Sequence, residues 1–292
     1  MQIAVLPKCW LEDITDGRMG LFKWIDMSAR LECDGLELYA GFLESHDPEY
    51  LADVRRRIEA LGMTMPMMCY SPDFTIPHAD ARKQEVRKQV EMIRVTAELG
   101  GTYCRTLSGQ ARPDVSIEQG SDWVVECIEA CLPAAERCGV KLVIENHYKD
   151  GYWKHVEFAQ KMEVFVNIVD RIDSPVFGVQ YDPSNAIVAG DDPIELLDTV
   201  LPRVMTMHAS DRYLLPGFSL EDLRQTDGTL GYAKGLVHGV TGKGLNDYDK
   251  IFGRLADVGY DSWISVEDGM NGMDELVESV DFLKRMRSRY MK

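Results

Sequence analysis

Short apolar segments alternate with longer amphipathic segments along the whole chain. Each apolar segment spans only a few residues, is rich in Val, Ile, Leu and Met, and is flanked by Gly, Pro or charged residues, which is typical of buried strands. These predicted strands cover residues 3–6, 35–39, 64–69, 102–107, 140–145, 176–181, 204–208 and 263–267.

The amphipathic segments between them have the spacing of helices. In "DVRRRIEALG", residues 53–62, the apolar Val54, Ile58 and Leu61 recur at intervals of three and four, and Gly62 follows as a stop signal. The same analysis predicts helices over residues 21–31, 48–61, 79–99, 116–138, 156–172, 193–201, 248–258 and 273–290.

This alternation predicts an α/β protein with a parallel sheet that is buried on both faces. Eight predicted strands, each followed by a helix, favour a closed (β/α)8 TIM barrel, formed as a single domain by residues 1–292. The absence of a G-x-G-x-x-G motif after the first strand argues against dinucleotide binding. Residues 209–247, after the seventh strand, form an unusually long connection rich in Gly, Asp and Tyr, and we expect an extended substrate loop or lid there.

Composition narrows the classes of function. The net charge of −16 disfavours binding to nucleic acid or to membrane phosphates. The start, "MQIAVLPKCW", does not resemble a signal peptide, and no apolar run approaches the roughly 18 residues of a membrane span. The seven scattered cysteines include no C-x-x-C pair, so we expect reduced thiols in a soluble, cytoplasmic protein.

Four consecutive predicted strands end in a side chain that can bind a metal. Glu145, Asp182, His208 and Glu267 close the fifth to the eighth strand, and barrel enzymes build their sites at this end of the strands. A single Asp or Glu at a strand end is more often a helix cap, but four neighbours together predict a metal site. Three carboxylates and one imidazole favour Mn²⁺, with Mg²⁺ or Co²⁺ as alternatives.

His147 lies two residues beyond Glu145. Because side chains alternate along an extended chain, His147 and Glu145 are expected to point the same way, so His147 is a candidate general base or acid beside the metal. A structural hydrogen bond from His147 to a loop carbonyl is the plainer alternative.

The motifs "IEN", "YDPSN", "MHASD", "GKGLNDYD" and "WISVEDG" together resemble the xylose-isomerase-like barrels of the sugar phosphate isomerase/epimerase group. Within this group, "ENH", "HASDRYL" and "HGVTGKGLNDYD" most resemble the α subunits of C-glycoside deglycosidases. That resemblance implies β-elimination from 3-oxo-C-glycosides, a smaller β subunit in a hetero-oligomer, the four metal ligands and a catalytic His147. If the enzyme is instead a keto-sugar isomerase or epimerase, Glu145 and Glu267 are the expected catalytic pair.

Two positions depart from the patterns of the group. Many relatives have a histidine three residues after the aspartate ligand, where this chain has Asn185, and ketose 3-epimerases carry an arginine at the position of Leu214. The nearest arginine is Arg212. We expect Asn185, Arg212, Asp211 and His238 to contact the substrate, although a surface ion pair explains Asp211 and Arg212 equally well and His238 can be simply exposed.

Other functions are less well supported. A DNA-repair endonuclease with this barrel needs three zinc ions and extra histidines from the early strands, whereas the whole chain has six histidines. A sugar phosphate is disfavoured because no cluster of Lys and Arg lies near the four strand ends, and a noncatalytic scaffold barrel remains a further alternative.

Overall fold

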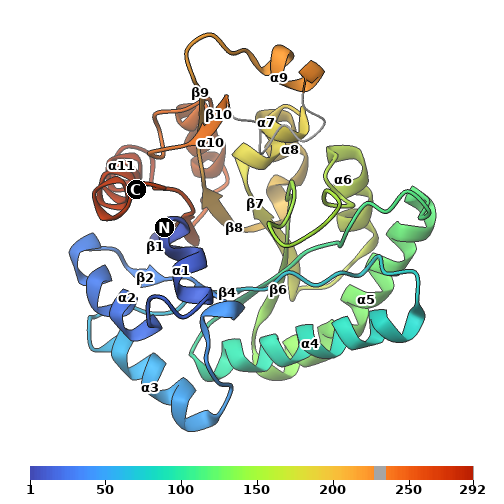
Figure 1. Ribbon diagram of the computed structural model, residues 1–292, viewed down its shortest axis with the longest axis horizontal. Helices are drawn as coiled ribbons and strands as arrows, with labels where there is room; N and C mark the ends of the chain where they lie inside the picture. The colour runs from blue at the N-terminus through green and yellow to red at the C-terminus, as the bar shows by residue number, and fades with distance from the viewer. Residues whose placement is uncertain (227–234, 292) are drawn as a thin grey trace.

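The computed structural model describes residues 1–226 and 235–291, and in this part of the chain nine parallel strands form one sheet with helices around it (Figure 1). The order of the strands across the sheet is β2-β1-β11-β8-β7-β6-β5-β4-β3. Their bounds are β1 Gln2–Val5, β2 Gly35–Leu36, β3 Leu38–Tyr39, β4 Met67–Cys69, β5 Tyr103–Thr106, β6 Lys141–Glu145, β7 Phe177–Tyr181, β8 Val204–Ala209 and β11 Trp263–Val266.

The sheet closes on itself at Glu37. Strands β2 and β3, which stand at the two ends of the strand order, are separated in sequence by this one residue and are two halves of a single interrupted strand. The Glu37 amide donates a hydrogen bond of 3.0 Å to the Val5 carbonyl, which keeps the interrupted strand in the sheet. The predicted single (β/α)8 barrel is therefore confirmed, and all eight predicted strands are present.

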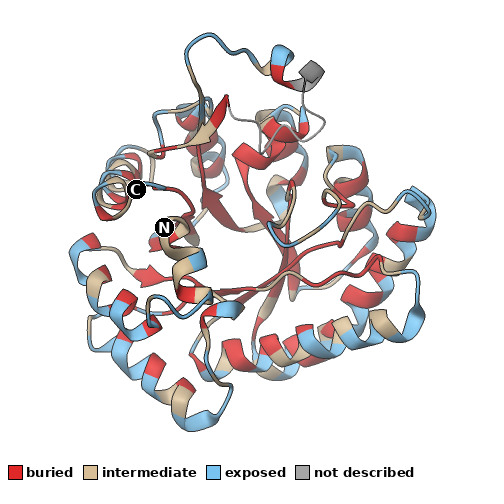
Figure 2. Ribbon diagram, viewed as in Figure 1, coloured by how far each residue is buried: buried red, intermediate tan, exposed pale blue. Residues whose placement is uncertain are grey.

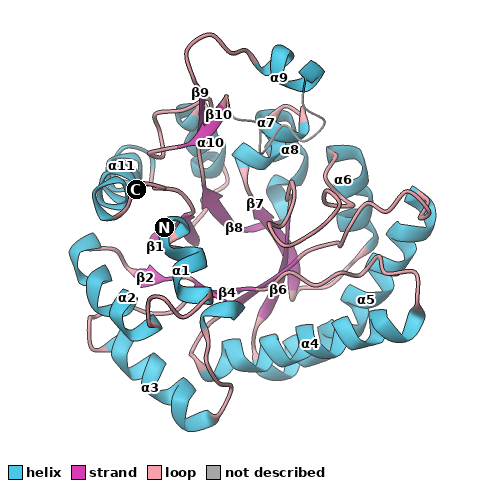
Figure 3. Ribbon diagram, in the orientation of Figure 1, coloured by secondary structure: helices cyan, strands magenta, loops and turns pink. Residues whose placement is uncertain are grey.

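Helices pack around the outside of the barrel, and the strands between them are almost entirely buried (Figures 2 and 3). Seven of the eight predicted helices lie close to their expected positions. The helices are α1 Leu11–Thr15, α2 Leu21–Ser28, α3 Pro48–Glu59, α4 Ala79–Glu98, α5 Ile117–Cys138, α6 Met162–Arg171, α7 Pro183–Ala189, α8 Pro193–Val200, α10 Tyr248–Asp257 and α11 Met273–Tyr290.

The prediction was wrong for the start of α6. A helix was expected from residue 156, but α6 begins at Met162. Glu157 is instead drawn into the barrel end, where its carboxylate accepts a hydrogen bond of 2.7 Å from the Ser108 amide. Its own amide donates to the Tyr148 carbonyl at 2.9 Å. Glu157 forms an isolated bridge with Gln110, and residues 158–159 form a turn, where the apolar spacing alone favoured a helix.

The long connection after β8 carries secondary structure of its own. Strands β9 (Arg212–Leu214) and β10 (Leu236–His238) form an antiparallel hairpin, and helix α9 (Leu220–Thr226) precedes the part of the expected loop that lies outside the described residues. A small apolar cluster packs the hairpin and α9 against α7 and the segment after β6; its buried members are Tyr148, Val188, Ala189, Leu223 and Leu236.

The sequence also led us to expect reduced cysteines and no membrane-spanning segment. The seven cysteines are free thiols. Within residues 1–226 and 235–291, no helix is both long enough and apolar enough to cross a membrane.

Candidate metal centre and substrate pocket

The four predicted ligands converge at one end of the barrel. One potential ligand atom from each of Glu145, Asp182, His208 and Glu267 lies within 4.8 Å of the others, and all four residues are buried. They come from the ends of β6, β7, β8 and β11, which are neighbours in the sheet. The residues therefore meet as predicted, while metal binding by them stays a prediction.

His208 stands at the centre of this cluster. Its Nδ1 atom lies 3.0 Å from Glu145 Oε1 and 3.4 Å from Glu267 Oε2. Asp182 approaches from the next strand and also caps α7, because its Oδ1 atom accepts a 3.0 Å hydrogen bond from the Asn185 amide. The common role of an aspartate after a strand, helix capping, is thus combined here with membership of the cluster.

Repulsion between the carboxylates of the cluster favours a cation. Burial and the charges of Glu145 and Glu267 raise the pKa of Asp182 to about 7. Burial alone would raise the pKa of Glu145, but the charges of Arg105 and His208 outweigh it and lower the pKa to about 2. Buried carboxylates that repel one another are stabilised by a divalent ion, and an oxygen-rich donor set suits Mn²⁺, Mg²⁺ or Co²⁺.

Two basic residues flank the cluster and were missed in the sequence. Arg105 Nη1 lies 2.7 Å from Glu145 Oε2 inside the barrel, and Lys8 Nζ lies 3.0 Å from Glu267 Oε1. Arg105 is the one charged residue of the buried strand β5. The sequence did contain a signal for this contact. A charged residue within a predicted buried strand indicates a buried partner of opposite charge, since such residues are almost never buried unpaired.

His147 faces the pocket beside the cluster and forms a pair with Glu157. His147 Nδ1 lies 3.4 Å from Glu157 Oε2, and Glu157 is fully enclosed. Burial by itself would lower the pKa of His147, but the hydrogen bond with Glu157 and the charges of Glu145 and Glu157 outweigh it and raise that pKa. The contact with Glu157 is made by Nδ1, so Nε2 is the ring nitrogen that Glu157 does not engage.

A cavity of about 870 Å³ opens at this end of the barrel, large enough for a glycoside. Three of the four predicted substrate residues, Asn185, Arg212 and His238, contribute to its walls. They do so together with Lys8, Tyr39, Cys69, Arg105, His147, Asp182, Tyr213 and Glu267.

Asp211, the fourth predicted substrate residue, binds the backbone of the connection after β10. Its buried carboxylate accepts hydrogen bonds from the amides of Gly242 at 3.0 Å, Gly244 at 2.8 Å and Asn246 at 3.2 Å. It is not among the residues that line the cavity. This position favours support of the connection after β10 over direct contact with a substrate.

His238, at the end of β10, lines the cavity and forms a second histidine–carboxylate pair. Its Nδ1 atom lies 3.0 Å from Asp268 Oδ1, and Asp268 is enclosed. Burial, followed by the charges of Arg212 and Lys8, places the pKa of His238 well below its usual value. The ring is therefore neutral at physiological pH and can serve as a hydrogen-bonding group on the lid side.

The model of the xylose isomerase-like TIM barrel family matches residues 25–286 of this sequence. The chain belongs to this family. The family membership agrees with the closed barrel.

Relatives in the family are named for several sugar reactions. The chain is 28% identical over 150 residues to an inosose dehydratase from Geobacillus kaustophilus, covering 50% of this chain and 46% of that protein. It is 26% identical over 241 residues to a 3-oxo-isoapionate decarboxylase from Pectobacterium atrosepticum, covering 82% and 70%. The alignments to the inosose dehydratases span less than half of those proteins.

Among solved structures, the fold is similar to that of 3-keto-D-glucoside 4-epimerase YcjR from E. coli. The TM-score is 0.70 at 14% sequence identity, and the match covers 99% of each chain.

Proposed function

We propose that this protein is a divalent-metal-dependent enzyme that removes a proton next to a sugar ketone and cleaves 3-oxo-glycosides, C-glycosides among them, by β-elimination. The observation that carries the proposal is that His147, which is paired with Glu157, lines the same cavity as Asp182 and Glu267 of the four-residue cluster. The names of the relatives support a polyhydroxylated ketone as substrate, since they include an inosose dehydratase and a 3-keto-D-glucoside epimerase.

The cluster would hold the metal through the three carboxylates and His208 Nδ1, with Mn²⁺ as our first choice. When bound, the ion supplies a Lewis acid that makes the C–H bond beside the ketone more acidic. Arg105 and Lys8 keep Glu145 and Glu267 ionised as ligands, through contacts of 2.7 Å and 3.0 Å.

His147 is the proposed base. Its Nε2 atom takes the proton from C2 of a 3-oxo-glycoside, the C–H electrons form the C1–C2 double bond, and the bond from C1 to the aglycone breaks. The aglycone leaves with that electron pair and is protonated by solvent. Glu157 holds His147 Nδ1 and stabilises the positive ring that results.

A keto-sugar isomerase or epimerase is the second candidate, because a solved structure with the same fold is a keto-glucoside epimerase. That chemistry would use Glu145 and Glu267 as acid and base. The lowered pKa values of both carboxyls, caused for Glu145 by Arg105 and His208 and for Glu267 by Lys8 and His208 against the effect of burial, make them weak bases and favour His147.

Incubation with Mn²⁺ in D₂O separates these functions. The substrates are 3-oxo-C-glucosides, 3-oxo-O-glucosides and a panel of ketoses, and the products are followed by chromatography and mass spectrometry. Release of the aglycone that is lost in His147→Ala, with metal content unchanged, would support the proposal. Deuterium in recovered ketose without aglycone release would favour the epimerase, and a protein that binds no divalent ion and turns over no substrate would be a scaffold.

The resemblance to deglycosidase α subunits also suggests a smaller partner subunit. The same assay is therefore repeated with the smaller subunit added. Activity that appears only in this mixture would support a hetero-oligomer, whereas equal activity of the chain alone would argue against one.

A further inference from the structure

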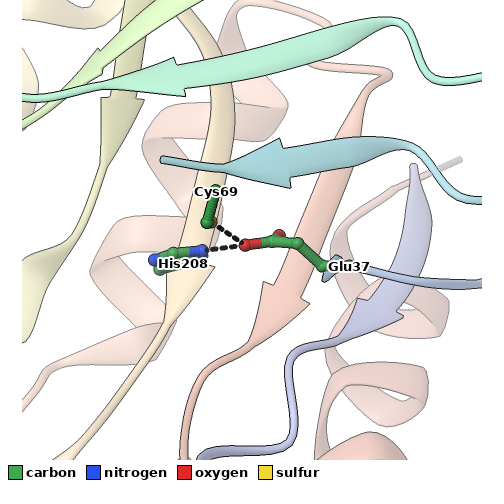
Figure 4. Close-up of side chains that lie close together, drawn as sticks. All are labelled: Glu37, Cys69 and His208. Carbon is green, nitrogen blue, oxygen red and sulfur yellow. Dashed lines mark hydrogen bonds and ion pairs between the residues drawn. The ribbon is translucent and has the colours of Figure 1, made fainter. Parts of the chain in front are cut away.

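A second buried cluster lies on the far side of His208 from the proposed metal site. Glu37 Oε1 lies 2.7 Å from His208 Nε2 and 2.7 Å from Cys69 Sγ, as Figure 4 shows. All three residues have no exposed surface. The two nitrogens of one imidazole ring therefore face different groups, Nδ1 the ligand carboxylates and Nε2 Glu37.

We propose that Glu37 and Cys69 are positioning residues that keep the proton of His208 on Nε2 and so present Nδ1 to the metal. An imidazole binds a cation only through a nitrogen that carries no proton. A carboxylate is only an acceptor, so Glu37 is satisfied when Nε2–H donates to it. The inference rests on the metal site proposed above and adds the group that sets the tautomer of its only imidazole.

Cys69 supports Glu37 as a second donor. Burial raises the pKa of the Cys69 thiol, so it stays protonated and its S–H donates to the same Oε1 atom. Two donors on one oxygen fix the carboxylate with respect to the ring. A buried acidic group of this kind is expensive to desolvate and adds little to stability, which indicates a role in the site.

The same three residues do not suit a cation of their own. Two ligand atoms on one zinc ion stand about 3.3–3.7 Å apart, given bond lengths of about 2.0–2.3 Å and tetrahedral angles. The separations of 2.7 Å here are those of hydrogen bonds. A metal there would also have to displace the proton of a thiol that burial keeps in place.

The position of Glu37 in the fold holds its backbone in place relative to His208. It is the one residue between β2 and β3, where the barrel closes, and its amide is bonded to β1. His208 is carried by β8, on the other side of β1 and β11 in the strand order. The contact between them spans the interior of the barrel, so the ring orientation is set by a group that belongs to a different part of the wall.

The test compares Glu37→Met, which removes the acceptor at similar size, with Glu37→Gln, which keeps one neutral acceptor. Cys69→Ser keeps a donor, Cys69→Ala removes it, and Thr206→Val is the matched control on β8 inside the same barrel. Mn²⁺ affinity is measured by calorimetry. ¹⁵N spectra of histidine-labelled, Mg²⁺-loaded protein report the His208 tautomer, and the chain has only six histidines to assign.

We expect wild-type His208 to be protonated on Nε2 and Glu37→Met to lose affinity by about 10-fold to 100-fold, the usual effect of removing such an outer group. Glu37→Gln should lose less Mn²⁺ affinity than Glu37→Met. The Mn²⁺ affinity of Cys69→Ser should match that of the wild type, and that of Cys69→Ala should lie between those of the wild type and Glu37→Met. Thr206→Val should bind Mn²⁺ like the wild type. Nε2 without a proton in the wild type, or Glu37→Met with unchanged affinity, would overturn the inference. If Glu37→Met does not fold, the wild-type spectrum and the Glu37→Gln and Cys69 variants decide. Failure of the wild type to bind any divalent ion would instead refute the proposed function.

Discussion

Asp182 provides a quantitative test of whether the cluster is organised around a cation. In the metal-free protein, burial and the charges of Glu145 and Glu267 raise its pKa from the usual 3.8 to about 7. Because the folded state then holds the proton more tightly than the unfolded state, folding stability falls as pH rises between these two values. At pH 8 the ionised side chain should destabilise the metal-free protein by about 4 kcal/mol.

Asp182→Asn removes this penalty and keeps the helix cap, since asparagine also accepts the hydrogen bond from the Asn185 amide. In EDTA at pH 8 the variant should therefore be more stable than wild type. The difference should shrink by about 2–3 kcal/mol at pH 5, where the wild-type carboxyl is protonated in the folded state. Added Mn²⁺ should narrow the gap at pH 8, because only the wild type gains binding energy, about 2.7 kcal/mol at 100 times the dissociation constant.

Urea unfolding followed by circular dichroism measures these differences. Asp192→Asn is the matched control, since Asp192 caps α8 through the Ile194 amide at 2.7 Å and lies outside the cluster. If metal-free Asp182→Asn is no more stable than wild type at pH 8, or if the gap does not change with pH, the carboxylates do not repel one another and the argument for a cation site fails.

Three further predictions concern the groups around the cluster. Glu157→Gln removes the negative charge beside His147, so the pKa of His147 should fall. The rising limb of the pH–rate profile should then move to lower pH. A profile that does not move would show that Glu157 does not affect the pKa of the proposed base. Arg105→Met leaves Glu145 without its buried partner and should destabilise the metal-free protein by about 3–5 kcal/mol in thermal or urea unfolding. The loss of stability should be smaller when Mn²⁺ is present. A loss below about 1 kcal/mol in the metal-free protein would contradict the assigned contact. His238→Ala should raise KM several-fold for glycosides while metal content by mass spectrometry stays constant, and loss of the metal would place His238 in the metal site instead.

The periodic apolar segments were sufficient to predict the barrel and the convergence of four strand ends. Parallel strands in a closed barrel bring their carboxyl ends to one edge, so local sequence was enough to place Glu145, Asp182, His208 and Glu267. The supporting groups were harder to foresee. Arg105 lies inside an apparently apolar strand, and its partner is set by the fold. A sequence pattern records that such a charge is unusual but does not say which residue faces it.

Glu157 and the connection after β8 contain structure that local patterns did not predict. The apolar spacing around Glu157 favoured a helix, but tertiary hydrogen bonds from Ser108 and to Tyr148 hold this residue outside α6. In the connection after β8, strands β9 and β10 pair across more than twenty residues, so no short hairpin turn joins them in the sequence. Asp211 was expected from the sequence to contact the substrate. The sequence does not distinguish an aspartate that binds backbone amides from one that binds a sugar.

The closure of the sheet at Glu37 also has a consequence for synthesis of the chain. Glu37 lies near the N-terminus, yet β1 completes the barrel wall by pairing with β11 at Trp263–Val266, close to the C-terminus. Contacts of such long sequence separation form slowly and late. We expect a nascent chain stalled on the ribosome before residue 263 to be sensitive to protease and unable to capture Mn²⁺, and capture by such a truncated chain would show that the last strand is dispensable for assembly.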